Sequence, residues 1–292
     1  MSDLDFSSTS PMKPAGQPAA PPPPPIYNAA MAMDFFKTAG KPESFAAGAN
    51  LFAEDDKGGL FKSPKMYVLI VGEIEMIAQN QVIGSVKAGE TFGEMAVIAQ
   101  AARTATARAK TQCTVIGLDE KQYQAALQQK PEFALMLMSI INSRLRSTIT
   151  RLRASGSLHA GEAKEAPVFD KKLMAGLVNL MGGQEPARYA AGKMIMQEGT
   201  GGAFMYVVLE GRVAITIKGG LVGRAGPGGV FGEMALVDQS ARAATAVAET
   251  DCALLAINRA AFLQLVKTSP AFGAALLSGI AARAKDMAVR NK

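Results

Sequence analysis

One segment of this chain occurs twice, and the repeat restricts the fold more strongly than composition does. Met66-Tyr-Val-Leu-Ile-Val-Gly aligns with Met205-Tyr-Val-Val-Leu-Glu-Gly at an offset of 139 residues (205 minus 66). The offset persists without a gap, pairing Gly72 with Gly211, Gly84 with Gly223, Gly89 with Gly228, Glu94 with Glu233, Arg103 with Arg242, Cys113 with Cys252 and Pro131 with Pro270. Repetition at a fixed period indicates two copies of one structural unit.

The length and the apolar content agree with two units. The chain has 292 residues, of which 49% are hydrophobic and 19% charged, and domains usually hold about 100 to 150 residues. Upstream, Phe45-Ala-Ala-Gly aligns with Tyr189-Ala-Ala-Gly at an offset of 144 (189 minus 45). The first unit therefore has a longer loop in the region 57–65, which makes it the less regular copy.

Each unit is predicted to be mainly β with flanking helices. Short apolar runs bounded by glycine predict strands, with counterparts in the second unit, at Met66–Val71, Glu73–Ile77, Val82–Val86 and Cys113–Leu118. Apolar stripes predict a helix after each set of strands, at Met138, Ile141, Leu145, Ile149 and Leu152 and again at Phe272, Leu276, Ile280 and Met287. Asp170 is expected to cap a helix through Leu173, Leu177 and Leu180.

These elements predict a division of the chain into four parts. Residues 1–32 form a Pro/Ala-rich disordered tail, 33–153 the first domain with its C-terminal helix, 154–168 a linker and 169–292 the second domain with its C-terminal helix. The tail contains the run Pro21–Pro25, which favours an extended polyproline II conformation. It is either a solvated spacer or a docking site for a protein partner.

The residue types present argue against several function classes. Cys113 and Cys252 lie in similar apolar settings, so buried strand residues are expected rather than a disulfide. His159 is the only histidine, which leaves no histidine set for a metal site or a catalytic triad. Neither unit offers a pair of nucleophile and base or a cluster of metal ligands, so the protein is not expected to be an enzyme.

Nucleic acid and membrane are not expected partners. The formal net charge is +6, but no run of five or more Lys or Arg occurs. Arg144, Arg146, Arg151 and Arg153 are expected on the solvated face of a helix, and the residues after Arg259–Lys267 are too few for a helix-turn-helix domain. Because no stretch approaches roughly 18 uninterrupted apolar residues, a cytoplasmic protein without a membrane span is expected.

The repeated segment that carries chemistry is Gly-x-x-Phe-Gly-Glu-Met-Ala followed by an arginine. Gly93 and Gly232 permit a sharp turn, after which Glu-Met-Ala can open a short helix whose first N–H groups would face an anion. An arginine nine residues after the glutamate supplies a planar charged fork for phosphate oxygens. Because a carboxylate repels phosphate, Glu94 and Glu233 are assigned to a sugar hydroxyl. The pattern thus predicts a nucleotide site.

These residues resemble the phosphate-binding cassette of the cyclic nucleotide-binding domain family, whose pattern is close to Phe-Gly-Glu-Leu-Ala, a variable stretch and Pro-Arg-Ala-Ala-Thr. Tyr67 to Gly72 and Tyr206 to Gly211 also look like that family. The resemblance covers about residues 40–290. Both copies have alanine, at Ala102 and Ala241, where the family usually has proline before the arginine.

The resemblance implies two tandem eight-stranded, jelly-roll-like β-rolls that bind cAMP or cGMP, without a metal, under a covering C-terminal helix. Carried over by position, the ligand-binding residues are Gly93, Glu94, Met95, Ala96, Arg103 and Thr104 in the first unit and Gly232, Glu233, Met234, Ala235, Arg242 and Ala243 in the second. A hydroxyl after the arginine occurs in members that favour cGMP and in some bacterial cAMP sensors, so Thr104 and Ala243 leave the choice of nucleotide open. Arg242 and Glu233 are the expected stronger site.

Two functions fit the sequence. The first is a non-enzymatic sensor or regulatory protein that relays cyclic nucleotide binding to a protein partner. The second is an interaction or scaffold protein with ligand-independent β-rolls and a proline-rich docking tail. The plan is similar to that of cAMP-dependent protein kinase regulatory subunits, but no Arg-Arg-x-Ser/Ala inhibitor segment is present in the tail. A second copy of the chain is a further candidate partner.

Overall fold

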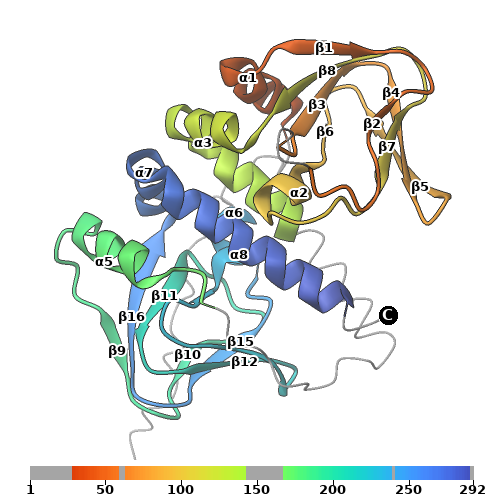
Figure 1. Ribbon diagram of the computed structural model, residues 1–292. Coiled ribbons are helices and arrows are strands. Elements are labelled where there is room, and N and C mark those ends of the chain that lie inside the picture. The colour runs from red at the N-terminus through yellow and green to blue at the C-terminus, as the bar shows by residue number, and fades with distance from the viewer. Residues whose placement is uncertain (1–27, 59–62, 143–166, 239–240, 290–292) are drawn as a thin grey trace, which may run out of the picture.

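The two halves of the chain fold into two units of the same architecture. The computed structural model describes residues 28–58, 63–142, 167–238 and 241–289 (Figure 1). The first unit contains the strands β1 (Pro42–Phe45), β2 (Asn50–Phe52), β3 (Met66–Val71), β4 (Glu73–Ala78), β5 (Gln81–Lys87), β6 (Thr91–Phe92), β7 (Thr106–Ala109) and β8 (Cys113–Leu118). The second contains β9 (Ala187–Tyr189), β10 (Met194–Met196), β11 (Phe204–Glu210), β12 (Val213–Ile217), β13 (Gly220–Ala225), β14 (Val230–Phe231), β15 (Thr245–Ala248) and β16 (Cys252–Asn258).

Each unit pairs its eight strands in two antiparallel four-stranded sheets. The strand orders are β1-β8-β3-β6 and β2-β7-β4-β5 in the first unit, and β9-β16-β11-β14 and β10-β15-β12-β13 in the second. Apolar side chains from both sheets meet between them, as Leu69 of β3 and Ile74 of β4 do in the first unit. The prediction of a mainly β chain with two tandem eight-stranded rolls and flanking helices is confirmed.

The aligned glycines have a steric cause. Gly72 and Gly211 follow β3 and β11 with φ of 101° and 84°, a conformation that side-chain-bearing residues rarely adopt. A Cβ at Gly211 would also lie 2.2 Å from the Asp251 carbonyl oxygen. Cys113 and Cys252 beside these turns are buried and free, as predicted.

The helices have local start signals. They are α1 (Ala29–Ala39), α2 (Glu94–Ile98), α3 (Glu120–Gln129), a helix at Glu132–Asn142, α5 (Lys171–Leu180), α6 (Glu233–Asp238), α7 (Arg259–Thr268) and α8 (Pro270–Val289). The Asp170 carboxylate accepts a hydrogen bond from the Leu173 amide at 2.8 Å, which confirms the expected cap of α5. The first helix, α1, begins at Ala29, within the range assigned to the tail.

The predicted apolar stripes are buried where the structure describes them. Met138 and Ile141 of the first stripe are buried, and so are Phe272, Leu276 and Ile280 of the second. The other stripe positions of the first unit, Leu145, Ile149 and Leu152, lie outside the described residues, as do Arg144, Arg146, Arg151 and Arg153.

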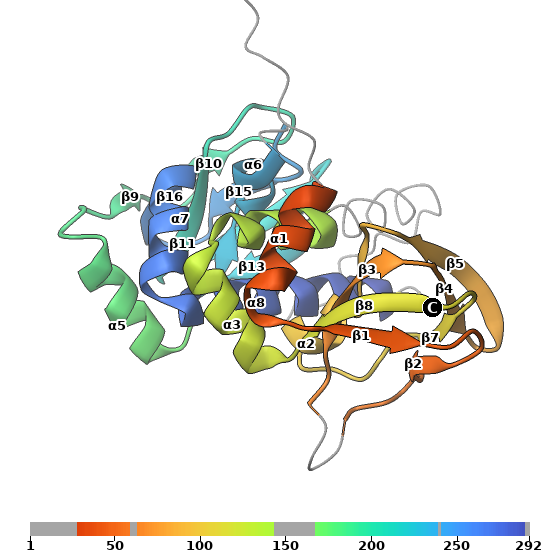
Figure 2. The ribbon, with the colours of Figure 1, turned by 90° about the horizontal axis from the view of Figure 1, so that it is seen from above.

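The helices of the two units form a shared layer. Figures 1 and 2 show the strands of the units at opposite ends, with α3 and α8 between them. Helix α8 of the second unit contacts both α2 and α3 of the first, and α3 also contacts α7. One apolar core therefore contains residues of both units, among them Phe133 and Leu127 from the first and Phe262 and Leu276 from the second.

Within the described ranges, no single helix has both the length and the apolar composition to cross a membrane. Helix α7 and the Pro270–Arg283 part of α8 pass that test only as a pair, which is bent by 116°.

Candidate functional site

In each unit a short strand is followed by a glycine in the left-handed backbone conformation and then by a short helix. Gly93 has φ of 72° and ψ of 8° between β6 and α2, and Gly232 has φ of 76° between β14 and α6. A Cβ would lie 2.9 Å from Arg103 Nη1 at Gly93 and 2.6 Å from Arg242 Nη1 at Gly232. The backbone conformation therefore requires glycine at both turns, and an arginine packs directly on each of them.

The two arginines fold back onto these turns. Arg103 Nη1 donates to the Gly93 carbonyl oxygen at 2.7 Å, and Arg242 Nη1 donates to the Gly232 carbonyl oxygen at 2.8 Å. Both side chains are buried, with 5% of each residue exposed. Burial lowers the pKa of each guanidinium, and nearby groups, first Tyr67 for Arg103 and Tyr206 for Arg242, oppose that shift.

The backbone of each arginine is held by the loop that precedes the third strand of its unit. The Arg103 amide donates to Asp56 O at 2.9 Å and its carbonyl accepts from the Asp55 amide at 3.0 Å. The Arg242 amide donates to Thr200 O at 2.8 Å and its carbonyl accepts from the Gly199 amide at 2.9 Å. Both arginines therefore emerge from a fixed backbone position.

The two glutamates are the first residues of the short helices, and both are buried. Glu94 is 2% exposed and Glu233 is 3% exposed. Glu233 Oε1 accepts a hydrogen bond from Arg283 Nη1 of α8 at 3.0 Å, and Arg283 Nη2 donates to Val230 O at 2.9 Å. The covering helix of the second unit is thus tied to the predicted sugar-binding carboxylate by an ion pair.

The structure brings Gly93, Glu94 and Arg103 together around one turn, and Gly232, Glu233 and Arg242 around the other. The remaining predicted residues lie on the same segments. Ala96 and Met234 are buried, Met95 and Ala243 are half-buried, Thr104 is exposed, and Ala235 lies within α6.

Sequence reasoning did not identify Arg283, Phe52 or the Lys65 carbonyl as parts of these surroundings. Arg283 aligns with Arg144 at the repeat offset of 139 residues (283 minus 144), so the repeat contained a signal for it. Phe52 lies beneath Arg103, with the guanidinium carbon 3.9 Å from the ring centroid. Lys65 contributes a backbone oxygen, which accepts from Arg103 Nη2 at 2.7 Å.

Arg283 gives a prediction about stability. We expect Arg283→Met to lower the free energy of unfolding by about 1 to 2 kcal/mol, because it leaves a buried carboxylate without its charged donor. Adding Glu233→Gln should restore part of that loss, since a neutral amide is less costly to leave buried. Urea denaturation measures both effects. Lys267→Met, at an exposed site of α7, is the matched control. Equal losses of stability in Arg283→Met and Lys267→Met would contradict a stabilising role for the ion pair.

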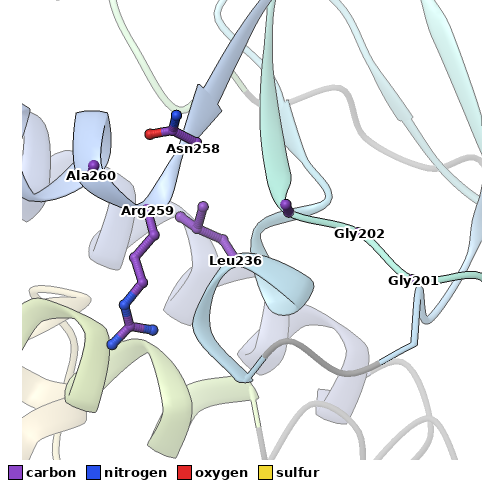
Figure 3. A pocket seen from close by; sticks show the side chains of 7 residues that line it. Gly201, Gly202, Leu236, Asn258, Arg259 and Ala260 are labelled. Carbon is purple, nitrogen blue, oxygen red and sulfur yellow. The ribbon is translucent and has the colours of Figure 1, made fainter. Parts of the chain in front are cut away.

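Two cavities lie beside the short helices, but they are not lined by the predicted arginine and glutamate. A cavity of about 680 Å³ is lined by Gly201, Gly202, Ala203, Leu236, Asn258, Arg259 and Ala260. Figure 3 shows Leu236 of α6 between Arg259 and Gly202. A cavity of about 670 Å³ in the first unit shares only Ala96 with the predicted residues. The two cavities therefore overlap with the predicted nucleotide contacts at Ala96 alone.

The acidic and sulfur side chains show no arrangement of metal ligands in the part of the chain that the structure describes. There, no group of three or more His, Cys, Asp or Glu side chains comes close enough to hold an ion.

Comparison with known proteins matches both units to the same family. A family model described as "Cyclic nucleotide-binding domain" matches residues 42–130 and 186–269. Solved structures that resemble the chain include the regulatory domain of Toxoplasma gondii PKA with cAMP, at 22% identity, covering 86% of this chain and 88% of that one, with a TM-score of 0.30.

Two further solved structures are similar. The regulatory subunit of a cAMP-independent protein kinase A from Trypanosoma brucei matches at 17% identity over 83% of this chain and 89% of its own, with a TM-score of 0.32. The N-terminal domain of a transcriptional regulator from Streptomyces coelicolor A3(2) matches at 24% identity over 41% of this chain and 86% of its own, with a TM-score of 0.34.

Proposed function

This chain belongs to the cyclic nucleotide-binding domain family, and we propose that it is a non-enzymatic regulatory protein that binds cAMP or cGMP at two sites. The observation that carries the proposal is the same in both units. A buried arginine donates to the carbonyl of the glycine that precedes a buried glutamate, at 2.7 Å in the first unit and 2.8 Å in the second. The ligand contacts are Gly93, Glu94, Met95, Ala96, Arg103 and Thr104, and Gly232, Glu233, Met234, Ala235, Arg242 and Ala243.

The positive and negative side chains of each site bind different parts of the nucleotide. Arg103 and Arg242 bind the cyclic phosphate, because a guanidinium offers several N–H donors in one plane and keeps its charge even where burial lowers its pKa. Glu94 and Glu233 accept hydrogen bonds from the ribose hydroxyl. A buried charge is costly unless it is compensated, so the anionic phosphate compensates the guanidinium better than neutral carbonyl oxygens do.

The relay to a protein partner runs through α8. Arg283 joins this helix to Glu233 at 3.0 Å, and the same helix contacts α2 and α3 of the first unit. A ribose hydroxyl at Glu233 changes the pairing of Arg283 and so the position of α8 that is most stable. A ligand shifts such an equilibrium by its difference in affinity for the two arrangements. The partner then recognises the altered helical layer.

Calorimetric titration with cAMP and with cGMP tests this function. We expect two binding events per chain, and the relative affinities of the two nucleotides decide between cAMP and cGMP. Thr104→Ala should change that ratio only at the first site if the hydroxyl takes part in the choice. Absence of heat and of a thermal shift at millimolar concentrations of both nucleotides would refute the proposal. Partner binding that persists unchanged after both arginines are replaced would instead support the scaffold function.

A further inference from the structure

Arg103 and Arg242 each donate a hydrogen bond to the glycine of their own turn, but their other surroundings differ. Arg103 lies over the Phe52 ring, with 3.9 Å between the guanidinium carbon and the ring centroid, and its Nη2 donates to Lys65 O at 2.7 Å. Arg242 lies 5.9 Å from the centroid of Tyr206. The first guanidinium is therefore held by an aromatic face and two carbonyl oxygens. The second donates to one carbonyl oxygen, that of Gly232, and packs on the Gly202 backbone, where a Cβ would lie 2.1 Å from Arg242 Nε, rather than on an aromatic face at close range.

Met196 is the structural counterpart of Phe52 in the second unit. Phe52 pairs with Ala107 between β2 and β7, and Met196 pairs with Ala246 between β10 and β15. Ala107 and Ala246 are themselves equivalent at the repeat offset of 139 residues (246 minus 107). The thioether of Met196 takes the corresponding place beside the turn, since a Cβ at Gly232 would lie 3.5 Å from its sulfur.

Phe52 is itself fixed by two further rings. Its centroid lies 6.0 Å from that of Tyr67 and 6.1 Å from that of Phe92, and those two rings are 5.4 Å apart, all in stacked orientation. The second unit keeps the counterparts of the last two rings, Tyr206 and Phe231, at 5.2 Å. Arg103 thus rests on one ring of a three-ring cluster, whereas the second unit has the flexible methionine Met196 where the third ring would be.

A cation over an aromatic face is attracted to it, more strongly when water is excluded. The interaction also restricts an otherwise mobile side chain, and a group that is already ordered loses less entropy when a ligand arrives. Two of the N–H donors of Arg103 are used by carbonyls, and the guanidinium carries five. The remaining donors stay available for phosphate.

We propose that Phe52 is a positioning residue, which holds Arg103 ready for the cyclic phosphate and makes the first site the tighter of the two. This inference rests on the proposed function. It reverses the expectation from sequence that Arg242 and Glu233 form the stronger site, an expectation that rested on Thr104 and on the longer loop in the first unit.

Reciprocal exchange of the two residues tests the proposal in the full chain. With Arg242→Ala present, so that only the first site remains, Phe52→Met should weaken cAMP and cGMP binding about fivefold, and Phe52→Tyr should keep the affinity. With Arg103→Ala present, Met196→Phe should tighten the second site by about threefold. Calorimetry measures each dissociation constant, and circular dichroism checks that each variant is folded.

A spectroscopic measurement separates positioning from a purely structural role. The Arg103 guanidinium protons should resonate upfield in NMR spectra of the ligand-free protein because of the ring current of Phe52. This shift should remain in Phe52→Tyr and disappear in Phe52→Met. Unchanged affinity in a folded Phe52→Met variant, or a first site weaker than the second in the wild-type protein, would overturn the inference. Failure of the wild-type chain to bind either nucleotide would overturn the proposed function instead.

Discussion

Replacement of both Arg103 and Arg242 with alanine will abolish calorimetrically detectable binding of cAMP and cGMP, and each single replacement will remove one of two binding events. Each guanidinium is a buried positive group next to its turn, with 5% of Arg103 and of Arg242 exposed. Loss of a buried, hydrogen-bonded partner of an anion typically costs about 2 to 5 kcal/mol. Each site should therefore weaken by about 30-fold or more.

The matched control is a partly exposed arginine on the strand that follows Arg103. Arg108 of β7 forms an ion pair with Glu75 at 2.9 Å, and 45% of its side chain is exposed. Arg108→Ala should leave both dissociation constants within about twofold, because exposed ion pairs contribute little. Two intact binding events in the double arginine variant would exclude these arginines as the phosphate ligands.

Phe133→Ala will lower the free energy of unfolding by about 3 to 5 kcal/mol, the usual cost of deleting a buried phenyl ring. Phe133 is fully buried. It stacks on Phe35 of α1 with 3.6 Å between ring centroids and meets Phe36 edge-on at 5.9 Å. Chemical denaturation measures the loss, and amide hydrogen exchange should show α1 opening more often than in the wild-type protein.

A surface substitution provides the comparison for this core variant. Val82 lies on β5 and is 60% exposed, so Val82→Ala should change stability by less than about 0.5 kcal/mol. If Phe133→Ala changed stability no more than Val82→Ala does, the packing of α1 against the helices after β8 would contribute nothing to the folded state.

The repeat allowed much of the architecture to be predicted. Gly72 and Gly211 recur because their backbone conformation excludes other residues, so their spacing marked where strands end. Arg103 and Arg242 recur at one distance from Gly93 and Gly232, and the structure joins each pair by a hydrogen bond. Local rules of turn chemistry and periodicity were sufficient for these features.

Contacts between distant elements could not be predicted in the same way. An apolar stripe on α8 indicates that one face of the helix is buried. The stripe does not indicate which elements cover that face, and in the structure α2 and α3 of the other unit contact α8. The pairing of Arg283 with Glu233 joins residues from separate helices, and Lys65 acts through a backbone oxygen, which no side-chain pattern can mark. Phe52 belongs to no motif in the sequence, and only the position of Arg103 above its ring distinguishes it.

The shared helical layer determines how the protein can be dissected. Because α8 and α7 cover apolar residues of α2 and α3, cutting the chain between the units would expose a continuous apolar face on each half. Such faces promote aggregation. The two halves are therefore poor candidates for separate expression, and the contribution of each site is better isolated by point substitution in the intact chain than by truncation.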